Sequence, residues 1–394
     1  MKQIRLTVGL LLCTIFLFAQ ETTDWSDFYF EVDDLNEKAF VDLAKDKLKN
    51  SQFVMVGEQH GIQEVAKVTD VFYQLGQPEG YRYLCVETDP LAARFLTEMQ
   101  GSPEEARLFY QKNPMSIPFY NNEDDHFLFE NVLKHKGTIW GIDQTMMAQF
   151  RLNFSFLLSQ TKNQAFKKQL TAELALANAA YKKAIEQKKF DELYIFNYDK
   201  NKHKMLQALA KTSEEKDILK QLWETRTIYN HYWQGEYYQN NNVRGNLMKQ
   251  HFSNYYKDAQ AKDPLPKVVF KLGANHAAKG LTRTNIYDIS NLAHELANFN
   301  GMESVHIFAM GISGEASLGN PFAPQPIMTF DNKKQFPEEI KNIIEQSQKK
   351  YLVIDVESMR KTAAYKKLPK DLQEVIFAYD LLILINDCKA VNSF

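Results

Sequence analysis

Two short motifs combine glycine with a histidine three residues later. The first, GEQHG, runs from Gly57 to Gly61 and directly follows the apolar segment FVMV. The second, GANH, ends at His276 and follows the apolar segment KVVFKL. Glycine lets a chain leave a strand sharply and lets a ligand approach the backbone closely. The two motifs therefore predict that His60 and His276 are presented at the ends of two strands, where imidazoles serve as acid, base or metal ligand.

Carboxylates accompany these imidazoles. Glu58 and Glu64 flank His60 in the sequence, and Glu87 ends the apolar run YLCV. An acid at the end of a buried strand needs a partner or a metal to offset its desolvation. Asp143 ends the segment GTIWGID, and this position fits either a site residue or the cap of the following helix. We therefore expect Glu58 and Glu87 to be site residues, with Glu64 and Asp143 as secondary candidates.

Arg244 and Asn275 complete the candidate set. Arg244 lies in the segment VRGNLM of a predicted helix, where it is either a surface residue or a site residue. Asn275 directly precedes His276. A cluster rich in aromatic residues lies just before Arg244, and it fits either helix packing or contact with an organic substrate. The cluster comprises Tyr229, His231, Tyr232, Trp233, Tyr237 and Tyr238.

The elements that must position these residues are seven short apolar segments predicted to be strands. They cover residues 53–58, 81–88, 137–143, 267–273, 304–313, 351–357 and 380–387. Several lack polar alternation, which is typical of strands covered on both faces. The segment between the first two has helical apolar spacing, so the domain begins with a β-α-β unit. The pattern predicts an α/β fold with a central, largely parallel sheet flanked by helices, whose ligand site lies beyond the carboxyl ends of the strands.

A long segment without strand signals separates the third and fourth predicted strands. Residues 154–262 are rich in helix-forming residues. We interpret this segment as a helical insertion into a single α/β domain that spans residues 21–394, because no repeat or low-complexity linker divides the chain.

The composition is that of an ordinary globular protein, with 394 residues, 44% hydrophobic and 24% charged. A net charge of -2 without long like-charge blocks excludes a field that would attract nucleic acid. Cys85 and Cys388 lie in strand-like segments far apart in the sequence. They could form a disulfide, but two buried free thiols are the favoured interpretation.

The N-terminus has the features of a secretory signal peptide. Lys2 and Arg5 precede an apolar run, and a short polar segment follows it. Cys13 lies inside the apolar run, at a position unsuited to lipid attachment. No second stretch of apolar residues follows that could span a membrane. We therefore expect residues 1–20 to be removed and the mature protein to be periplasmic or secreted, without an integral membrane segment.

Five motifs together resemble the erythromycin esterase-like superfamily, which includes the ChaN-like and TraB/Tiki-type proteins. They are GEQHG, CVETD, WGID, VRGNLM and GANH, and they occur in this order over most of the mature chain. One residue separates Glu58 from His60, whereas the esterase branch has two between its Glu and His. This spacing points to the branches with paired Gly-x-x-His motifs, while Arg244 and Asp143 look more like the esterase branch.

The resemblance implies a hydrolase site made of Glu58, His60, Glu87, Arg244 and His276. His60 would be the general base on water, oriented by Glu58 or Glu87, and His276 or Arg244 would stabilise the oxyanion. The substrate would be an ester, amide or peptide bond in a small molecule or peptide.

Two alternatives stay open, a metal-assisted form of the same hydrolase and a binding protein. His60, His276, Glu58 and Glu87 could hold a divalent metal such as zinc, manganese or cobalt. The ChaN-like resemblance also implies a haem- or metal-binding protein without catalysis, with His, Tyr and Met residues near the strand ends as ligands.

Overall fold

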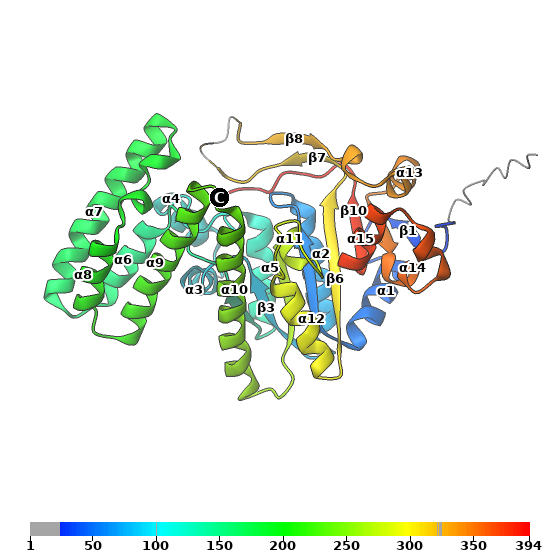
Figure 1. Ribbon diagram of the computed structural model, residues 1–394, viewed down its shortest axis with the longest axis horizontal. Helices are drawn as coiled ribbons and strands as arrows, with labels where there is room; N and C mark the ends of the chain where they lie inside the picture. The colour runs from blue at the N-terminus through cyan, green and yellow to red at the C-terminus, as the bar shows by residue number, and fades with distance from the viewer. Residues whose placement is uncertain (1–23, 100, 321, 323–324) are drawn as a thin grey trace, which may run out of the picture.

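The computed structural model describes residues 24–394 except residues 100, 321, 323 and 324 (Figure 1). The predicted signal peptide, residues 1–20, lies outside the described residues. Within the described part of the chain, no helix has both the length and the apolar character needed to cross a membrane.

An eight-stranded sheet forms the centre of the molecule, in the order β1-β9-β10-β6-β2-β5-β3-β4. The strands are β1 (Tyr29–Val32), β2 (Ser51–Glu58), β3 (Tyr81–Val86), β4 (Thr138–Gly141), β5 (Lys267–Gly273), β6 (Glu303–Gly311), β9 (Tyr351–Asp355) and β10 (Leu381–Ile385). The six strands from β10 to β4 are parallel, and β9 runs antiparallel between β1 and β10. All seven predicted strands are present, so the predicted α/β class is confirmed.

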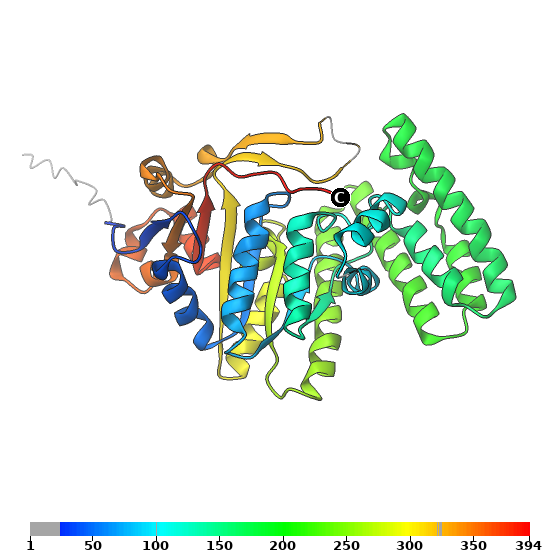
Figure 2. The same cartoon turned by 180° about the vertical axis from the view of Figure 1, so that it is seen from behind.

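Strands that the apolar pattern did not predict are short and peripheral. β1 has four residues at the edge of the sheet. β7 (Ser313–Ala316) and β8 (Met328–Asp331) form a separate antiparallel ribbon that extends beside the main sheet (Figure 2). Strands of this length bury too few apolar residues to produce a clear pattern in the sequence.

Helices cover both faces of the sheet. The helices α1 (Lys38–Lys49), α2 (Gln63–Gly76) and α5 (Glu123–Lys134) cover one face, which is turned toward the viewer in Figure 2. The helices α10 (Tyr237–Gln260), α12 (Ile289–Phe299) and α15 (Lys370–Ala378) cover the other. Alternation along β2 sends Val54 toward the first face and Phe53 toward the second. Because β2 is buried on both sides, its sequence is a continuous apolar run.

The two thiols lie on opposite faces of the sheet. Cys85 belongs to the apolar core on the α10 side and Cys388 to the core on the α2 side. Both are buried and free, which confirms the favoured interpretation.

The predicted helical insertion is present between β4 and β5. It comprises α6 (Phe150–Gln160), α7 (Gln164–Gln187), α8 (Lys200–Leu209), α9 (Ser213–Trp233) and α10. The helices α6 to α9 surround an apolar core of their own and form one end of the molecule in Figure 1. Helix α10 instead packs on the sheet through Phe252, which contacts Phe53 and Phe270. The last helix of the insertion is therefore part of the layer that covers the sheet.

Three neighbouring parallel strands, β2, β5 and β3, end at the same edge of the sheet. Glu58 at the end of β2 pairs with Gly273 at the end of β5. The short helix α11 (Ala274–Ala277) directly follows β5 and carries the second motif. This arrangement brings both Gly-x-x-His motifs and Glu87 to one edge.

Candidate active site

The glycine of each Gly-x-x-His motif makes room for the other motif. A Cβ on Gly57 would lie 2.8 Å from the Cβ of Ala277 and 3.0 Å from the Cα of Ala274, both in α11. A Cβ on Gly273 would lie 3.1 Å from Nε2 of His60. Any larger residue at either position would push the two segments apart. Glycine is thus required for close packing of one motif against the other.

His60 is held between a carboxylate and an aromatic ring. Its Nδ1 lies 2.8 Å from Oε1 of Glu58, and because an ionised carboxylate only accepts, Nδ1 donates and the free lone pair of the neutral ring is on Nε2. The ring stacks on Phe119 with centroids 4.0 Å apart and planes 10° apart. Phe119 has a φ of 70°, an uncommon value for a residue with a side chain. Burial lowers the pKa of His60, but the hydrogen bond and charge of Glu58 outweigh burial and raise it.

His276 has an equivalent arrangement. Its Nδ1 lies 2.7 Å from Oδ2 of Asp288, the residue that caps the N-terminus of α12. Its Nε2 lies 3.5 Å from Oε1 of Glu87. Burial lowers the pKa of His276, but the charges of Asp288 and Glu87 dominate and raise it to about 10. His276 is therefore an imidazolium at neutral pH.

Glu87 lies at the centre of the cluster. Its Oε2 accepts a hydrogen bond of 2.5 Å from the backbone N–H of Gly273 and lies 3.7 Å from Nε2 of His60. Its Oε1 accepts a hydrogen bond of 2.7 Å from Nη2 of Arg244. Burial alone would raise the pKa of Glu87, but the charges of His276, His60 and Arg244 hold that pKa well below its ordinary value. One buried carboxylate thus binds the guanidinium and the backbone of Gly273 and lies close to both imidazoles.

Arg244 is fixed by two acids. Its Nε and Nη2 donate to the two carboxylate oxygens of Asp143 at 2.9 and 2.6 Å, a bidentate pair, in addition to the bond to Glu87. Helix α10 supplies the arginine, and the residue just after β4 supplies Asp143. The side chain of Arg244 is 24% exposed to solvent, whereas that of Asp143 is 2% exposed. The buried acids therefore fix the orientation of the guanidinium, which remains partly exposed at the site.

A buried lysine forms an ion pair with the second carboxylate oxygen of Glu58. Nζ of Lys271 lies 2.6 Å from Oε2 of Glu58 and 2.9 Å from Oδ1 of Asp125. All three side chains are 3% exposed. Burial would raise the pKa of Glu58, but the charge of Lys271 and the hydrogen bond from His60 lower it to about 2. Glu58 is thus ionised throughout the physiological pH range and always accepts from His60.

The structure brings most of the predicted residues together. Glu58, His60, Glu87, Arg244, His276 and Asp143 form one connected set through the contacts given above. Glu64 is a correction to the predicted set: it lies in the first turn of α2, and its Oε1 pairs with Nζ of Lys350 at 2.7 Å. Asn275 is exposed and lines a cavity next to the cluster.

Comparison with known proteins gives the fold but no sequence family. No model of a protein family matches the chain, and no curated protein matches it. A protein from Bacillus cereus matches with a TM-score of 0.57 at 15% identity, over 93% of this chain and 97% of its own. A succinoglycan biosynthesis protein matches with a TM-score of 0.58 at 14% identity, over 93% and 96% of the two chains. Erythromycin esterase EreC in its open conformation matches with a TM-score of 0.56 at 11% identity, over 91% and 95%.

The chain has the erythromycin esterase-like fold. The coverage of more than nine-tenths on both sides means that the helical insertion is part of the shared architecture. The resemblance inferred from the five motifs is thereby confirmed at the level of the fold. Identities of 11 to 15% carry no information on the substrate.

The erythromycin esterase-like fold does not arrange the predicted metal ligands around a cation here. Among residues 24–394, apart from those not described, no group of three or more His, Cys, Asp or Glu side chains is placed to hold a metal ion. Both oxygens of Glu58 already accept from Lys271 and His60, and both oxygens of Glu87 accept from Arg244 and Gly273. The two carboxylates of the possible metal set are therefore already bound by protein donors, and metal binding stays a prediction. Haem binding likewise stays a prediction.

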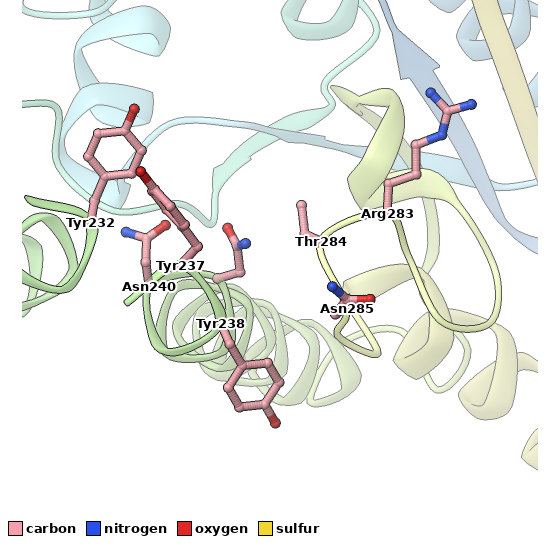
Figure 3. A pocket seen from close by; sticks show the side chains of 8 residues that line it. Tyr232, Tyr237, Tyr238, Asn240, Arg283, Thr284 and Asn285 are labelled. Carbon is pink, nitrogen blue, oxygen red and sulfur yellow. The ribbon is translucent and has the colours of Figure 1, made fainter. Parts of the chain in front are cut away.

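The aromatic cluster before Arg244 divides into two groups. Tyr229 stacks on Trp233 and packs against the core of the insertion. Tyr232, Tyr237 and Tyr238 are more than half exposed and line a pocket of about 300 Å³. Figure 3 shows this pocket between the start of α10 and the loop that carries Arg283, Thr284 and Asn285. Packing and an open pocket thus both occur, in different parts of the cluster.

Three residues of the cluster escaped the sequence analysis. Lys271 was visible as a charge inside the apolar segment KVVFKLG, and such a charge needs a buried partner. Asp288 lies 12 residues after His276 and carries only an ordinary helix-cap signal. Asp125 lies among neighbouring acids in the segment EDDH, so the sequence does not distinguish it.

Proposed function

We propose that the protein is a hydrolase that activates water at His60 and cleaves an ester, amide or peptide bond in a small molecule or peptide. One observation carries the proposal. Two imidazoles each bind a carboxylate through Nδ1 and direct Nε2 toward the same buried Glu87, beside the oriented guanidinium of Arg244. Nearby carboxylates raise the pKa of both imidazoles, and buried titratable groups shifted by specific charge partners are a mark of functional sites.

His60 is assigned as the general base. Its partner Glu58 stays ionised because Lys271 holds it, so the Glu58 carboxylate fixes the tautomer that leaves Nε2 free. The side chain of His60 is 22% exposed, more than the 13% of His276. His60 is thus the more solvent-accessible of the two imidazoles, which favours it as the base that activates water. The same carboxylate stabilises the imidazolium that forms when His60 accepts the proton.

We assign to His276 and Arg244 the stabilisation of the negative charge that develops on the carbonyl oxygen. Both carry a positive charge at neutral pH, and both have their positions fixed by buried acids. Attack of the water oxygen on the carbonyl carbon moves the proton to Nε2 of His60 and the negative charge to the carbonyl oxygen. Preorganised donors stabilise that charge by several kcal/mol. The proton on His60 then passes to the leaving group, which restores the base.

A screen of ester, amide and peptide substrates tests the proposal. The mature protein should hydrolyse at least one class, and its activity should be the same with a chelator as with added divalent metal, because the described residues place no ligand set around a cation. If activity vanishes with chelation and returns with one metal, that metal rather than His60 would activate the water. Stoichiometric haem uptake that is lost in both His60→Ala and His276→Ala, without any hydrolysis, would favour a binding protein instead.

Export is a second part of the proposal. Lys2, Arg5 and the following apolar run support it. The N-terminus of protein recovered from the periplasm or the medium should lie near Gln20. An intact Met1 on that protein would contradict export by a cleaved signal peptide.

A further inference from the structure

The helical layer leaves part of a central strand uncovered. β6 lies between β10 and β2, and both of these neighbours are buried along their whole length. Phe308 and Met310 of β6 nevertheless remain only partly buried, although they point toward the face that α12 and α15 cover. Apolar side chains in the middle of a parallel sheet are normally covered by helices on both faces. Partly exposed apolar residues at this position therefore indicate a cleft, which α15 borders together with α11 and the loop that follows it.

A cavity of about 1100 Å³ lies over these side chains. Aromatic residues from both sides line it in addition to Phe308, namely Phe336, Tyr365, Phe377 and Tyr379. This volume is slightly above the range of about 300–1,000 Å³ that is typical of pockets for drug-sized ligands, and a mainly apolar lining is typical of such sites. The floor of the cleft thus suits an apolar group, while polar and charged side chains form its rim.

One end of the cleft lies at the candidate active site. Glu58 and Asn275 line that end, and they stand two residues before His60 and one residue before His276 in the sequence. A group that occupies the cleft would therefore extend from the strand ends over the floor formed by β6. His60 and His276 do not themselves line the cleft, but this proximity would allow one molecule to occupy the cleft and react at His60.

The charges at the rim do not select a charged group. Arg283, Lys334 and Lys370 contribute positive charge, and Asp371 and Glu374 contribute negative charge. Each of these five is exposed, and within the described part of the chain none has an ion-pair partner. Exposed charges of both signs largely cancel one another at physiological ionic strength. Selectivity then depends on the apolar floor.

We propose that the cleft binds an uncharged, extended apolar group of the substrate, such as the acyl chain of a medium-chain ester. The part of this proposal that links the cleft to catalysis rests on the proposed hydrolase function. The part that concerns binding does not, and it can be tested without any turnover.

Binding is tested with N-phenyl-1-naphthylamine, an uncharged fluorescent probe, and its displacement by 1-decanol. The probe should bind the native protein, and Phe377→Ser should weaken its binding at least about fivefold, because this ring lines the cleft. Phe299→Ser is the matched control, because Phe299 is also an exposed phenylalanine near the end of a helix but does not line the cleft. Met310→Glu, which places a charge on the floor, should abolish binding; circular dichroism reports whether this second variant folds.

Turnover is tested with p-nitrophenyl esters of two to ten acyl carbons. The kcat/KM value should rise with chain length, by at most about fourfold per methylene, and Phe377→Ser should flatten this rise while acetate hydrolysis stays unchanged. Probe binding that Phe377→Ser weakens, without hydrolysis of any ester, amide or peptide in the screen, would overturn the hydrolase function and retain the cleft. Hydrolysis that is independent of chain length, together with equal probe binding in Phe377→Ser and Phe299→Ser, would overturn the cleft and retain the hydrolase.

Discussion

The ring of His60 lies directly against the backbone of Gly273. The two residues belong to different motifs, and a Cβ on Gly273 would lie 3.1 Å both from Nε2 of His60 and from Oε2 of Glu87. The backbone N–H of Gly273 also donates to Glu87. The GANH motif therefore sets the position of His60 in the other motif as well as the position of its own His276.

Substituting Gly273 by alanine should lower catalytic activity strongly while lowering the stability of the fold only slightly. The added methyl group must displace His60 or Glu87 by a few tenths of an ångström, and misplacement of a catalytic group on this scale reduces rates strongly. We expect Gly273→Ala to lower kcat/KM at least about tenfold and the free energy of unfolding by only about 1–2 kcal/mol.

Gly235→Ala is the matched control for this substitution. Gly235 has a φ of 75° and open space around it, so alanine there should cost about 1 kcal/mol through backbone strain. Its activity should be unchanged. Full activity in Gly273→Ala would show that the close approach to His60 has no catalytic consequence.

Substituting Lys271 by methionine should destabilise the fold. The change leaves the buried carboxylates of Glu58 and Asp125 without their shared cation, and breaking a buried ion pair in this way costs about 3–5 kcal/mol. Urea denaturation of Lys271→Met and of Lys38→Met provides the comparison, because Lys38 forms an exposed pair with Asp42 that is worth at most about 1 kcal/mol. Equal stability of the two variants would contradict the role assigned to Lys271.

The pH dependence of kcat/KM should be bell-shaped. His60 acts as base only when neutral, so activity should rise as the pH increases through its pKa, which Glu58 raises above the ordinary 6.5. His276 acts only as a cation, so activity should fall as the pH increases through its pKa of about 10.

Asp288→Asn should move only the descending, high-pH limb of the pH profile of kcat/KM. Asparagine still caps α12 but removes the charge that does most to raise the pKa of His276. The descending limb should shift to lower pH while the ascending limb stays in place. A profile in which both limbs move together would mean that the two histidines titrate as one unit and that separate roles are wrong.

Substituting Arg244 by lysine should retain the charge and lose the geometry. A lysine cannot make the bidentate pair with Asp143 while also reaching Glu87. Loss of one oriented donor to an oxyanion typically lowers kcat about 10²- to 10³-fold. Arg94→Lys is the control, because Arg94 pairs with Glu98 and Glu214 on the surface and should tolerate the change. A loss of less than threefold in Arg244→Lys would remove the guanidinium from the mechanism.

Much of this fold could be predicted because its strands are buried on both faces. Burial on both sides gives continuous apolar runs, and the polar residues that break such runs at Glu58, Glu87 and His276 mark the strand ends. Strand order was not predictable, because the pairing of β2 with β5 joins segments more than 200 residues apart. The convergence of the two motifs therefore depended on topology that the sequence pattern does not contain.

The supporting residues were harder to predict than the reacting ones. Asp288 supports His276 from a helix cap, and Asp125 supports Lys271 from the start of α5. In each case the residue type is ordinary for its local position, and only the tertiary contact gives it a further role. Glu64 is the opposite case, since it lies close to His60 in sequence but pairs with Lys350 in the structure.

The most direct test of the account is the activity of His60→Ala on the substrate found by screening, measured together with its stability. We predict that kcat/KM falls about 10²- to 10⁴-fold, while the free energy of unfolding changes by less than about 1 kcal/mol, because Glu58 keeps Lys271 as its partner. Val54→Ala, in the core of β2, provides the scale for a structural loss. Undiminished activity in His60→Ala, or a loss of stability as large as that of Val54→Ala, would contradict the assignment of His60 as the catalytic base.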